Sequence, residues 1–381
     1  MSIISATFER GWKTLPNRRL YKNFDIYLFL VTLALSIYGL LVIYSATRVM
    51  GLEDPLLFVK RQAIWLGAGL AGIILISLID YANFSSWARY IYFINIALLV
   101  AVLALGRGDN VKRWIDLGFV DIQPSEYAKF ALILLLARLL SEKEGQLGKR
   151  FSASIPALIY TAVLMVLIFL QPDLGTAMVI VAILLGLLFV AGINLKYLFY
   201  MLVSGVAVFP VLWKFLADYQ KNRLMIFLNP EMDPLGDGYQ LMQSIIAVGS
   251  GSIWGKGLFE GTQVRLNYLP AQHTDFIFAV LGEELGFVGA MGLLLLFFLL
   301  IYRILWIGSQ SKDIFGSLFC SGVAIMFSFH VLVNIGMTIG IMPVTGLPLP
   351  FISYGGNSLL INFLAIGLVL NIGMRRQKIQ F

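Results

Sequence analysis

Long apolar runs separated by short polar segments cover most of this chain of 381 residues. The runs lie at about 24–46, 62–79, 88–106, 125–141, 153–171, 174–193, 196–216, 276–302, 314–341 and 351–373. Each is close to the roughly 20 residues that an α-helix needs to cross the hydrocarbon core of a bilayer. The pattern therefore predicts an all-α polytopic membrane protein with about ten transmembrane helices, in a single transmembrane domain over residues 24–374.

Composition agrees with this class of protein. Hydrophobic residues make up 59% of the chain and charged residues 13%, whereas a soluble domain has about 25% charged residues. Cys320 is the single cysteine and cannot form an internal disulfide, and His273 and His330 are too far apart in sequence to indicate a metal site by spacing. The sequence has no zinc-hydrolase, P-loop or dinucleotide-binding motif, which argues against soluble nucleotide chemistry.

The positive charge follows the pattern of a membrane protein rather than that of a nucleic-acid-binding protein. The net charge is +7, and no basic run is interleaved with aromatic residues. Lys and Arg collect in the cytoplasmic segments of membrane proteins, and both ends of this chain are basic. Because an even number of helices puts both ends on one side, we expect residues 1–23 and 375–381 to be cytoplasmic tails.

With this orientation, the longest connection becomes one large extracytoplasmic loop over about residues 217–275. It is rich in Gly and Pro, and residues 239–248 within it have the pattern of a short amphipathic helix at the membrane surface. Loops longer than about 12–15 residues are usually functional or disordered. Large apolar side chains such as Trp254 and Tyr268 disfavour disorder, so we expect the loop to be functional.

The segment 269–286 places three carboxylates at the start of, and inside, an apolar run. An ionisable residue at membrane depth is energetically costly and is therefore a candidate for function. Asp275 lies where the loop becomes a helix, and two compatible roles follow. Thr274 or Asp275 caps the helix, and Asp275 acts as a general base that faces water and a lipid-borne substrate. Glu283 and Glu284 lie two turns further along, and we expect them to bond to neighbouring helices.

Glu126 and Lys129 open the fourth helix and are i,i+3 neighbours. Two interpretations remain open: an intrahelical ion pair that neutralises both charges, or a Lys129 that faces a cavity and contacts an anionic substrate or Asp275. Asp173, between two helices that have almost no loop, is interpreted as an N-cap.

Further basic side chains fall near the predicted outer face, and arginine forks suit phosphate oxygens. They are Arg48, Lys60, Arg61, Lys112, Arg113, Arg223, Lys256 and Arg265. As a group they could hold a phosphate-bearing lipid headgroup, although each alone could simply be solvated.

The connection at 341–358, which includes Ser353, contains three prolines and repeated glycines. Such irregular backbone is tolerated near a membrane where it lines a cavity, so we interpret it as a cavity wall.

Together these segments resemble the SEDS family, the shape, elongation, division and sporulation proteins. The resemblance covers about residues 21–374 and is strongest at 123–129, 171–177, 223–230 and around Asp275 and Ser353. The short N-terminal tail and the spelling of 233–239 and 342–350 are most similar to the elongation branch of the family. Asn357 departs from the pattern, because many members have a serine there.

The resemblance implies a peptidoglycan glycosyltransferase in the bacterial cytoplasmic membrane. It would polymerise lipid II at the outer face during cell elongation and rod-shape maintenance, with a class B penicillin-binding protein and the elongation machinery as partners. It also implies that Asp275 is the essential aspartate and that Glu126, Lys129 and Ser353 belong to or support the same cavity.

The chemistry of lipid II suits this residue set. Glycoside hydrolases generally use two carboxylates, but a pyrophosphate leaves as an anion and needs no protonating acid. Asp275 alone would deprotonate the acceptor hydroxyl, which attacks the donor's anomeric carbon with inversion. The cations expected to stabilise the departing pyrophosphate are Arg48, Lys112, Arg113 and Arg223. A divalent cation such as magnesium or manganese could share this role, although the sequence has no dedicated metal cage.

Other functions remain open from the sequence. A lipid II flippase needs polar residues along a whole transbilayer path, whereas here they gather toward one face, with Glu283 and Glu284 as exceptions. A non-catalytic scaffold for the penicillin-binding protein is a second alternative. A role in division instead of elongation is a third.

Overall fold

The computed structural model describes residues 23–48, 54–106, 113–116, 118, 121–234, 236–266 and 268–376, without the side chain of Leu212. Most of the two predicted tails lies outside the described residues, and so does Lys112.

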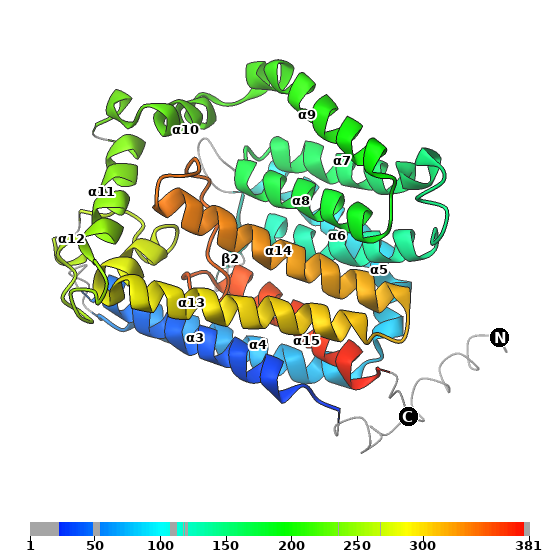
Figure 1. The fold of residues 1–381 in the computed structure, drawn as a ribbon, viewed down its shortest axis with the longest axis horizontal. Helices are drawn as coiled ribbons and strands as arrows, with labels where there is room; N and C mark the ends of the chain where they lie inside the picture. The colour runs from blue at the N-terminus through cyan, green and yellow to red at the C-terminus, as the bar shows by residue number, and fades with distance from the viewer. Residues whose placement is uncertain are drawn as a thin grey trace.

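A bundle of long helices makes up most of the described chain (Figure 1). Those long and apolar enough to cross a membrane are α3 (Ile26–Thr47), α4 (Leu57–Leu78), α5 (Tyr81–Leu105), α7 (Ile155–Phe169, extended by the 3-10 turn η1, Phe151–Ser154), α13 (Ile277–Ser309), α14 (Ile314–Thr338) and α15 (Gly356–Met374). Beside these seven lie α6 (Pro124–Ser141), α8 (Leu174–Val190) and α9 (Leu195–Phe215). The described residues thus contain seven helices able to cross a membrane, and three further helices lie at the remaining predicted positions.

Several predicted helix starts are wrong by about a turn or more. The second helix begins at Leu57, because polar side chains such as Lys60 and Arg61 do not interrupt backbone hydrogen bonding. The third begins at Tyr81, where Asp80 caps it by accepting a bond from the Ala82 amide at 3.0 Å. A search for apolar runs misses both starts because it penalises polar residues at helix ends.

At one end of the bundle, the start of α3 is fastened to the ends of α13 and α15. Asp25 caps α3, accepting from the Leu28 amide at 3.0 Å, and forms an ion pair of 2.8 Å with Arg303 near the end of α13. The Asn23 side chain donates to the carbonyl of Met374 at 3.5 Å, so the described chain begins and ends at this end.

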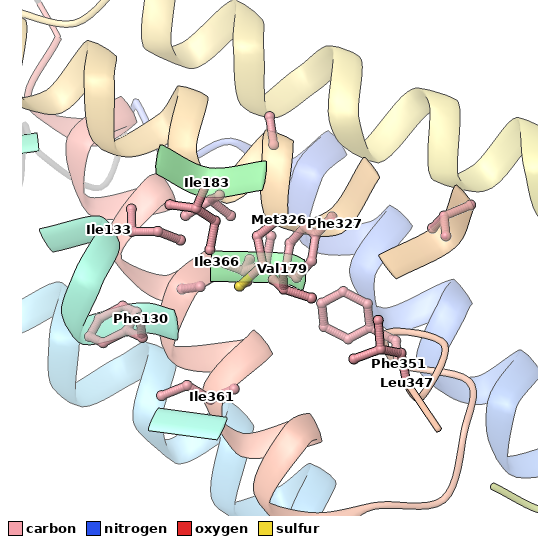
Figure 2. Packing of buried hydrophobic residues seen from close by; sticks show 14 of the residues in the cluster. Phe130, Ile133, Val179, Ile183, Met326, Phe327, Leu347, Phe351, Ile361 and Ile366 are labelled. Carbon is pink, nitrogen blue, oxygen red and sulfur yellow. The ribbon is translucent and has the colours of Figure 1, made fainter. Parts of the chain in front are cut away.

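The core lies where α6, α8, α14 and α15 meet (Figure 2). Phe130 and Phe319 pack edge to face, with ring centroids 5.9 Å apart. Glycine allows α4 and α15 to approach closely, because a Cβ on Gly69 would lie 2.6 Å from the Phe363 ring. Small residues at helix contacts are the usual means of tight packing in membranes.

The long loop folds into short helices that cover the opposite end of the bundle (left in Figure 1). They are α10 (Asp218–Leu228), the 3-10 turn η2 (Pro230–Met232), α11 (Asp237–Ser250) and α12 (Thr262–Arg265). The helix predicted at 239–248 is α11. Ser244 on α11 donates to the Thr338 carbonyl at 2.8 Å, which fastens α11 to the end of α14. At the same end, β1 (Ile115–Asp116) and β2 (Asp121–Ile122) form a small antiparallel pair.

Helix α13 is broken at Gly286, whose φ of 63° and ψ of −161° are not helical. The loop residues 251–257 satisfy the backbone groups that the break leaves free. Lys256 N donates to the Glu283 carbonyl at 3.0 Å, and Phe287 N donates to the Ser252 carbonyl at 2.9 Å. The break therefore anchors the long loop to the helix that follows Asp275.

Candidate functional site

A cavity of about 900 Å³ opens at the end of the bundle that carries the long loop. Its walls come from α4, the hairpin and start of α6, the start of α8, residues 273–275, and the connection between α14 and α15. Segments far apart in sequence thus meet around one space. The predicted cavity wall at 341–358 contributes residues 346–348 and 354–358.

Asp275 lies on the cavity wall, in the turn before α13. It does not cap that helix: the N-cap is Phe276, and no side chain supplies a capping bond. The capping interpretation is therefore wrong, and the carboxylate accepts no hydrogen bond from a backbone amide of the described residues. The main chain is fixed instead by Asn334 of α14, whose side-chain amide donates to the carbonyls of Asp275 at 2.9 Å and Leu347 at 2.7 Å.

Two arginines act on the charge of Asp275. Burial raises the pKa of this carboxyl above its ordinary value, while the charges of Arg223 and Arg113 oppose the rise. Gly346 lies between the groups, since a Cβ there would be 3.5 Å from Oδ2 of Asp275 and 3.7 Å from Nη1 of Arg223. This glycine has a φ of +72°, which favours glycine.

The arginines reach the site from separate segments. Arg113 donates to the Gln171 carbonyl at 3.0 Å, to the Pro172 carbonyl and to the Tyr219 hydroxyl at 2.9 Å. Arg223 of α10 lies 3.5 Å from a carboxylate oxygen of Asp237, with its guanidinium 5.8 Å from the centre of the Tyr219 ring. These contacts hold α10 next to Arg113, which lines the cavity, whereas Arg223 is not among the lining residues.

The predicted pyrophosphate cations are only partly brought together. Arg113 and Arg223 lie near Asp275. Arg48 is not among the lining residues, and its guanidinium lies 4.8 Å from the centre of the Phe259 ring, because the end of α3 meets the long loop there. Lys112 lies outside the described residues. Arg61 does line the cavity, although nothing in the sequence separates it from the other outer cations.

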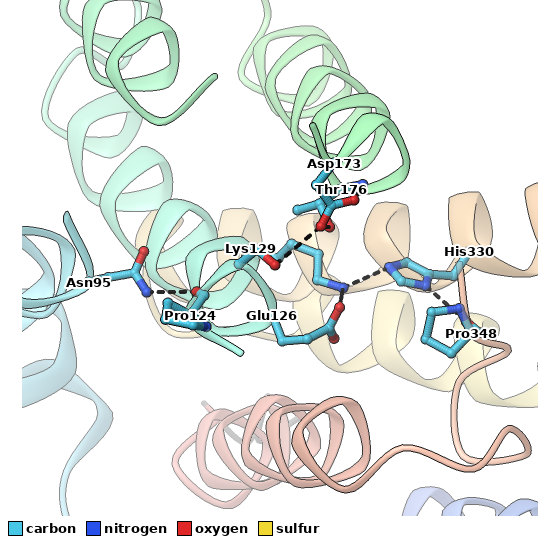
Figure 3. A network of polar contacts seen from close by, with 9 residues as sticks. Asn95, Pro124, Glu126, Lys129, Asp173, Thr176, His330 and Pro348 are labelled. Carbon is cyan, nitrogen blue, oxygen red and sulfur yellow. Dashed lines mark hydrogen bonds and ion pairs between the residues drawn. The ribbon is translucent and has the colours of Figure 1, made fainter. Parts of the chain in front are cut away.

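Glu126 and Lys129 form a buried ion pair of 2.8 Å (Figure 3). The Lys129 ammonium also lies 3.2 Å from Nε2 of His330, whose Nδ1 is 3.1 Å from the Pro348 carbonyl. Lys129 does not line the cavity, so the structure shows the neutralised pair and not a lysine facing substrate. Glu126 does line it, with Oε2 buried and without a partner among the described residues.

Ser353 connects the cavity wall to the Asp275 segment. Its hydroxyl donates to the Thr274 carbonyl at 2.7 Å and accepts from the Leu349 amide at 2.8 Å. It supports the site from behind, since it is not a lining residue. Asn357 does line the cavity, and its side chain donates to the Asp121 carbonyl at 2.7 Å and accepts from the Tyr127 hydroxyl at 3.1 Å.

His273 is a lining residue that the sequence did not single out as functional. Its ring packs against Phe58, with centroids 4.6 Å apart, and against Tyr354 at 5.6 Å. Burial lowers its pKa, so this imidazole is neutral at physiological pH. Only proximity to Asp275 in sequence could have pointed to it.

The remaining buried carboxylates have structural partners. Oε1 of Glu283 accepts from the Lys256 ammonium at 2.7 Å and the Gln263 amide at 3.0 Å, and Glu284 accepts from the Ser45 hydroxyl at 2.5 Å. Neither glutamate lines the cavity, in agreement with the predicted interior role. Asp173 caps α8 as predicted, accepting from the Thr176 amide at 3.2 Å.

No group of three or more His, Cys, Asp and Glu side chains in the described part of the chain could hold a metal ion by itself. The carboxylates that line the cavity are Asp116, Asp121, Glu126, Asp173 and Asp275, and none of them belongs to such a group. A divalent cation there would need substrate oxygens as further ligands, as magnesium commonly does.

The model of the FtsW/RodA/SpoVE cell cycle protein family matches residues 25–378. The chain belongs to this family. It is 40% identical over 376 residues to the peptidoglycan glycosyltransferase MrdB of Escherichia coli K12, covering 96% of this chain and 98% of that protein. It is 39% identical over 354 residues to the stage V sporulation protein E of Bacillus subtilis, covering 91% and 96%. The expected SEDS family is thus confirmed.

Solved structures of similar proteins have the same fold as this chain. The rod-shape-determining protein RodA of Thermus thermophilus is 31% identical, with a TM-score of 0.70 over 93% of this chain and 98% of that one. A chain from a peptidoglycan synthase complex that coordinates polymerization and crosslinking is 34% identical, with a TM-score of 0.78 over 92% and 97%. The protein is therefore a multi-pass protein of the bacterial inner membrane with the RodA fold.

Proposed function

We propose that this protein is a peptidoglycan glycosyltransferase that polymerises lipid II at the outer face of the cytoplasmic membrane. The observation that carries the proposal is the position of the Asp275 carboxylate, which caps no helix and lines a cavity of about 900 Å³. The charges of Arg113 and Arg223 act on this carboxylate. The similarity to MrdB, a peptidoglycan glycosyltransferase, supports the same activity.

In the proposed reaction, a carboxylate oxygen of Asp275 takes the proton of the acceptor sugar hydroxyl. The hydroxyl oxygen then forms a bond to the donor's anomeric carbon while the bond from that carbon to the diphosphate breaks, which inverts the configuration. The diphosphate leaves as an anion and needs no acid. Arg113 and Arg223 stabilise its charge, because positive groups already in place beside a developing negative charge lower the barrier.

A divalent cation such as magnesium or manganese is a further part of the proposal. Its ligands would be Asp275 and diphosphate oxygens, and it would supply additional positive charge to the leaving group. Polymerisation in the presence of a chelator, with and without added magnesium, tests this part independently of Asp275.

The proposal also names a protein partner and a cellular process, elongation rather than division. A class B penicillin-binding protein as partner agrees with the similar synthase complex, which coordinates polymerization with crosslinking. Elongation and rod shape agree with the RodA fold. Division proteins are equally similar in sequence, as with the probable peptidoglycan glycosyltransferase FtsW of Coxiella burnetii at 40% identity over 365 residues. Loss of rod shape on depletion, without a block in septation, would distinguish elongation from division.

The flippase alternative is weakened by Glu283 and Glu284. Their carboxylates bond to Lys256, Gln263 and Ser45 and do not line the cavity, so they do not extend a polar path across the bundle. The polar groups of the cavity gather at one end.

The experiment that tests the proposal compares wild type with Asp275→Asn. Purified protein and its penicillin-binding partner are given labelled lipid II, with the transpeptidase blocked by penicillin, and products are separated on a gel. We expect polymer from wild type and a loss of about a hundredfold or more for Asp275→Asn, the usual size of a general-base effect. Asp218→Asn is the matched control, because that side chain is 98% exposed. Polymer at the wild-type rate from Asp275→Asn would show that the base lies elsewhere.

A further inference from the structure

His330 of α14 joins the buried Glu126–Lys129 pair to the cavity wall (Figure 3). Its Nε2 lies 3.2 Å from the Lys129 ammonium, and its Nδ1 lies 3.1 Å from the Pro348 carbonyl oxygen. The three side chains of this network are almost completely buried, with exposed fractions of 4% for Glu126, 1% for Lys129 and 4% for His330. Pro348 lines the cavity, whereas Lys129 and His330 do not. Lys129 therefore reaches this wall through the imidazole.

The partners of His330 decide which of its ring nitrogens carries the proton. A carbonyl oxygen can only accept a hydrogen bond, and an ammonium can only donate one. Nδ1 must therefore carry a proton and donate to Pro348, while Nε2 must offer its lone pair to Lys129. A proton on Nε2 would point at the Lys129 ammonium, which has no lone pair to accept it. Both partners thus require the neutral Nδ1–H tautomer, and the imidazole links them.

The wall beside Asp275 is held from the same face of α14. Asn334 lies one turn after His330, and residues four apart on a helix share a face. The Asn334 amide donates to the carbonyl of Leu347, the residue before Pro348, at 2.7 Å, and also to the carbonyl of Asp275 at 2.9 Å. His330 and Asn334 therefore hold two consecutive carbonyls of the wall. A shift of the wall at Pro348 would be passed through the shared Asn334 amide to the main chain of Asp275.

We propose that His330 is a positioning residue for the reaction at Asp275, acting as the link from the buried ion pair to the cavity wall. The inference rests on the proposed function. A buried ion pair contributes little net stability compared with apolar residues of the same size, so the Glu126–Lys129 pair is better explained by what it holds in place. Glu126 fixes the Lys129 ammonium, the ammonium fixes the imidazole, and the imidazole fixes the wall. Reaction rates depend steeply on such placement, since a displacement of about 1 Å can cost about a hundredfold.

The tautomer can be measured directly by nitrogen NMR, because the chain has only two histidines. Full-length protein with isotopically labelled histidine and an affinity tag without histidine gives imidazole signals from His273 and His330 alone, and His273→Phe assigns them. We expect a neutral His330 ring with its proton on Nδ1. A proton on Nε2, or on both nitrogens, would overturn the proposal. Because this readout needs no substrate, it remains valid if the protein proves not to be a polymerase.

Variants of His330 test the positioning role in the polymerisation assay. His330→Leu removes both hydrogen bonds and should lower kcat about tenfold or more, with the KM for lipid II little changed. His330→Gln keeps an acceptor and a donor on one side chain and should recover most of kcat. Asn371→Leu is the matched control, because it also removes a buried side chain that holds two carbonyls, at the other end of the bundle, and it should keep kcat even if the melting temperature falls. An unchanged kcat in His330→Leu, or a raised KM alone, would contradict positioning.

A double-mutant cycle tests whether the ion pair acts through His330. Glu126→Gln combined with Lys129→Met removes the pair without leaving a buried charge unpaired, and it should lower kcat by itself. In a His330→Leu background the same change should have little further effect on kcat, because the link to the wall is already lost. Losses of kcat that simply multiply would show that the pair and His330 act separately, which would overturn the proposed link.

Discussion

At the scale of single residues, Asp275 is under two opposing influences. Burial raises its pKa, and the charges of Arg223 and Arg113 hold the rise back. A general base must be deprotonated to act, so the arginines have two effects: they favour the ionised form of the base and they attract the diphosphate.

The pH dependence of polymerisation should therefore shift when one arginine is neutralised. Activity should fall as the pH drops through the pKa of Asp275, because the protonated carboxyl cannot accept a proton. Arg223→Gln removes a charge that lowers this pKa, so the acid limb should move to higher pH. Rates across an acid-to-neutral series measure the shift, with Arg265→Gln as control, since Arg265 pairs with Glu260 on the surface at 2.7 Å. An unmoved acid limb would argue against Asp275 as the base.

Asn334 is expected to position Asp275. Asn334→Leu leaves two buried carbonyls without their donor, which costs about 1–3 kcal/mol for each group, and it frees the Asp275 segment. We expect a lower melting temperature and a kcat reduced about tenfold or more. Asn371→Leu is the matched control, because Asn371 is equally buried and also bridges two carbonyls, those of Ile76 and Ile79, at the other end of the bundle. Equal loss of kcat in both variants would mean that kcat falls because the protein is less stable, and not because Asp275 has moved.

These residues differ in how visible they are in the sequence. Asp275 and the Glu126–Lys129 pair can be found because a charge in an apolar run is conspicuous. Asn334 cannot, because small polar residues in apolar helices are common and its partners, the Asp275 and Leu347 carbonyls, belong to other segments. Arg48 shows the converse, since its place near the outer face predicted a phosphate contact, whereas the fold puts it against Phe259.

At the scale of elements, the break in α13 decides how the long loop is held. Gly286 has a φ of +63°, and a Cβ on it would clash with the Gly255 amide nitrogen. The apolar run at 276–302 predicts this helix but not its break, because glycine is frequent in transmembrane helices. The segment that pairs with the break, at 251–257, is also remote in sequence.

Gly286→Ala should therefore destabilise the protein. The substitution forces an L-residue into a strained backbone region, at a cost of about 1–3 kcal/mol, and it pushes the loop off the helix. Gly292→Ala is the control in the same helix, since a Cβ there meets nothing within 4 Å. Thermal unfolding in detergent should show a lower midpoint for the first variant and little change for the second. Equal midpoints would show that the break is not a constraint.

At the scale of the whole molecule, the two ends of the bundle differ. One end holds the cavity and the long loop, and the other holds ion pairs such as Asp25–Arg303 and Arg375–Asp80, at 2.8 and 3.3 Å. The sequence predicts this division from the spacing of apolar runs and the basic tails, but it does not predict which side chains meet in the cavity. That depends on packing between helices, which residue pattern alone does not specify.

The proposed activity requires the cavity end to face outside the cell, and accessibility to a membrane-impermeant maleimide tests this. In a Cys320→Ala background, which removes a fully buried thiol, Asp218→Cys should be labelled in intact cells because α10 covers the cavity end. Lys143→Cys should be labelled only after permeabilisation. It follows α6 at the opposite end, where Glu142 lies 3.6 Å from Arg89 near the start of α5. The reverse pattern would place the cavity in the cytoplasm, where a polymerase of exported lipid-linked sugar could not act.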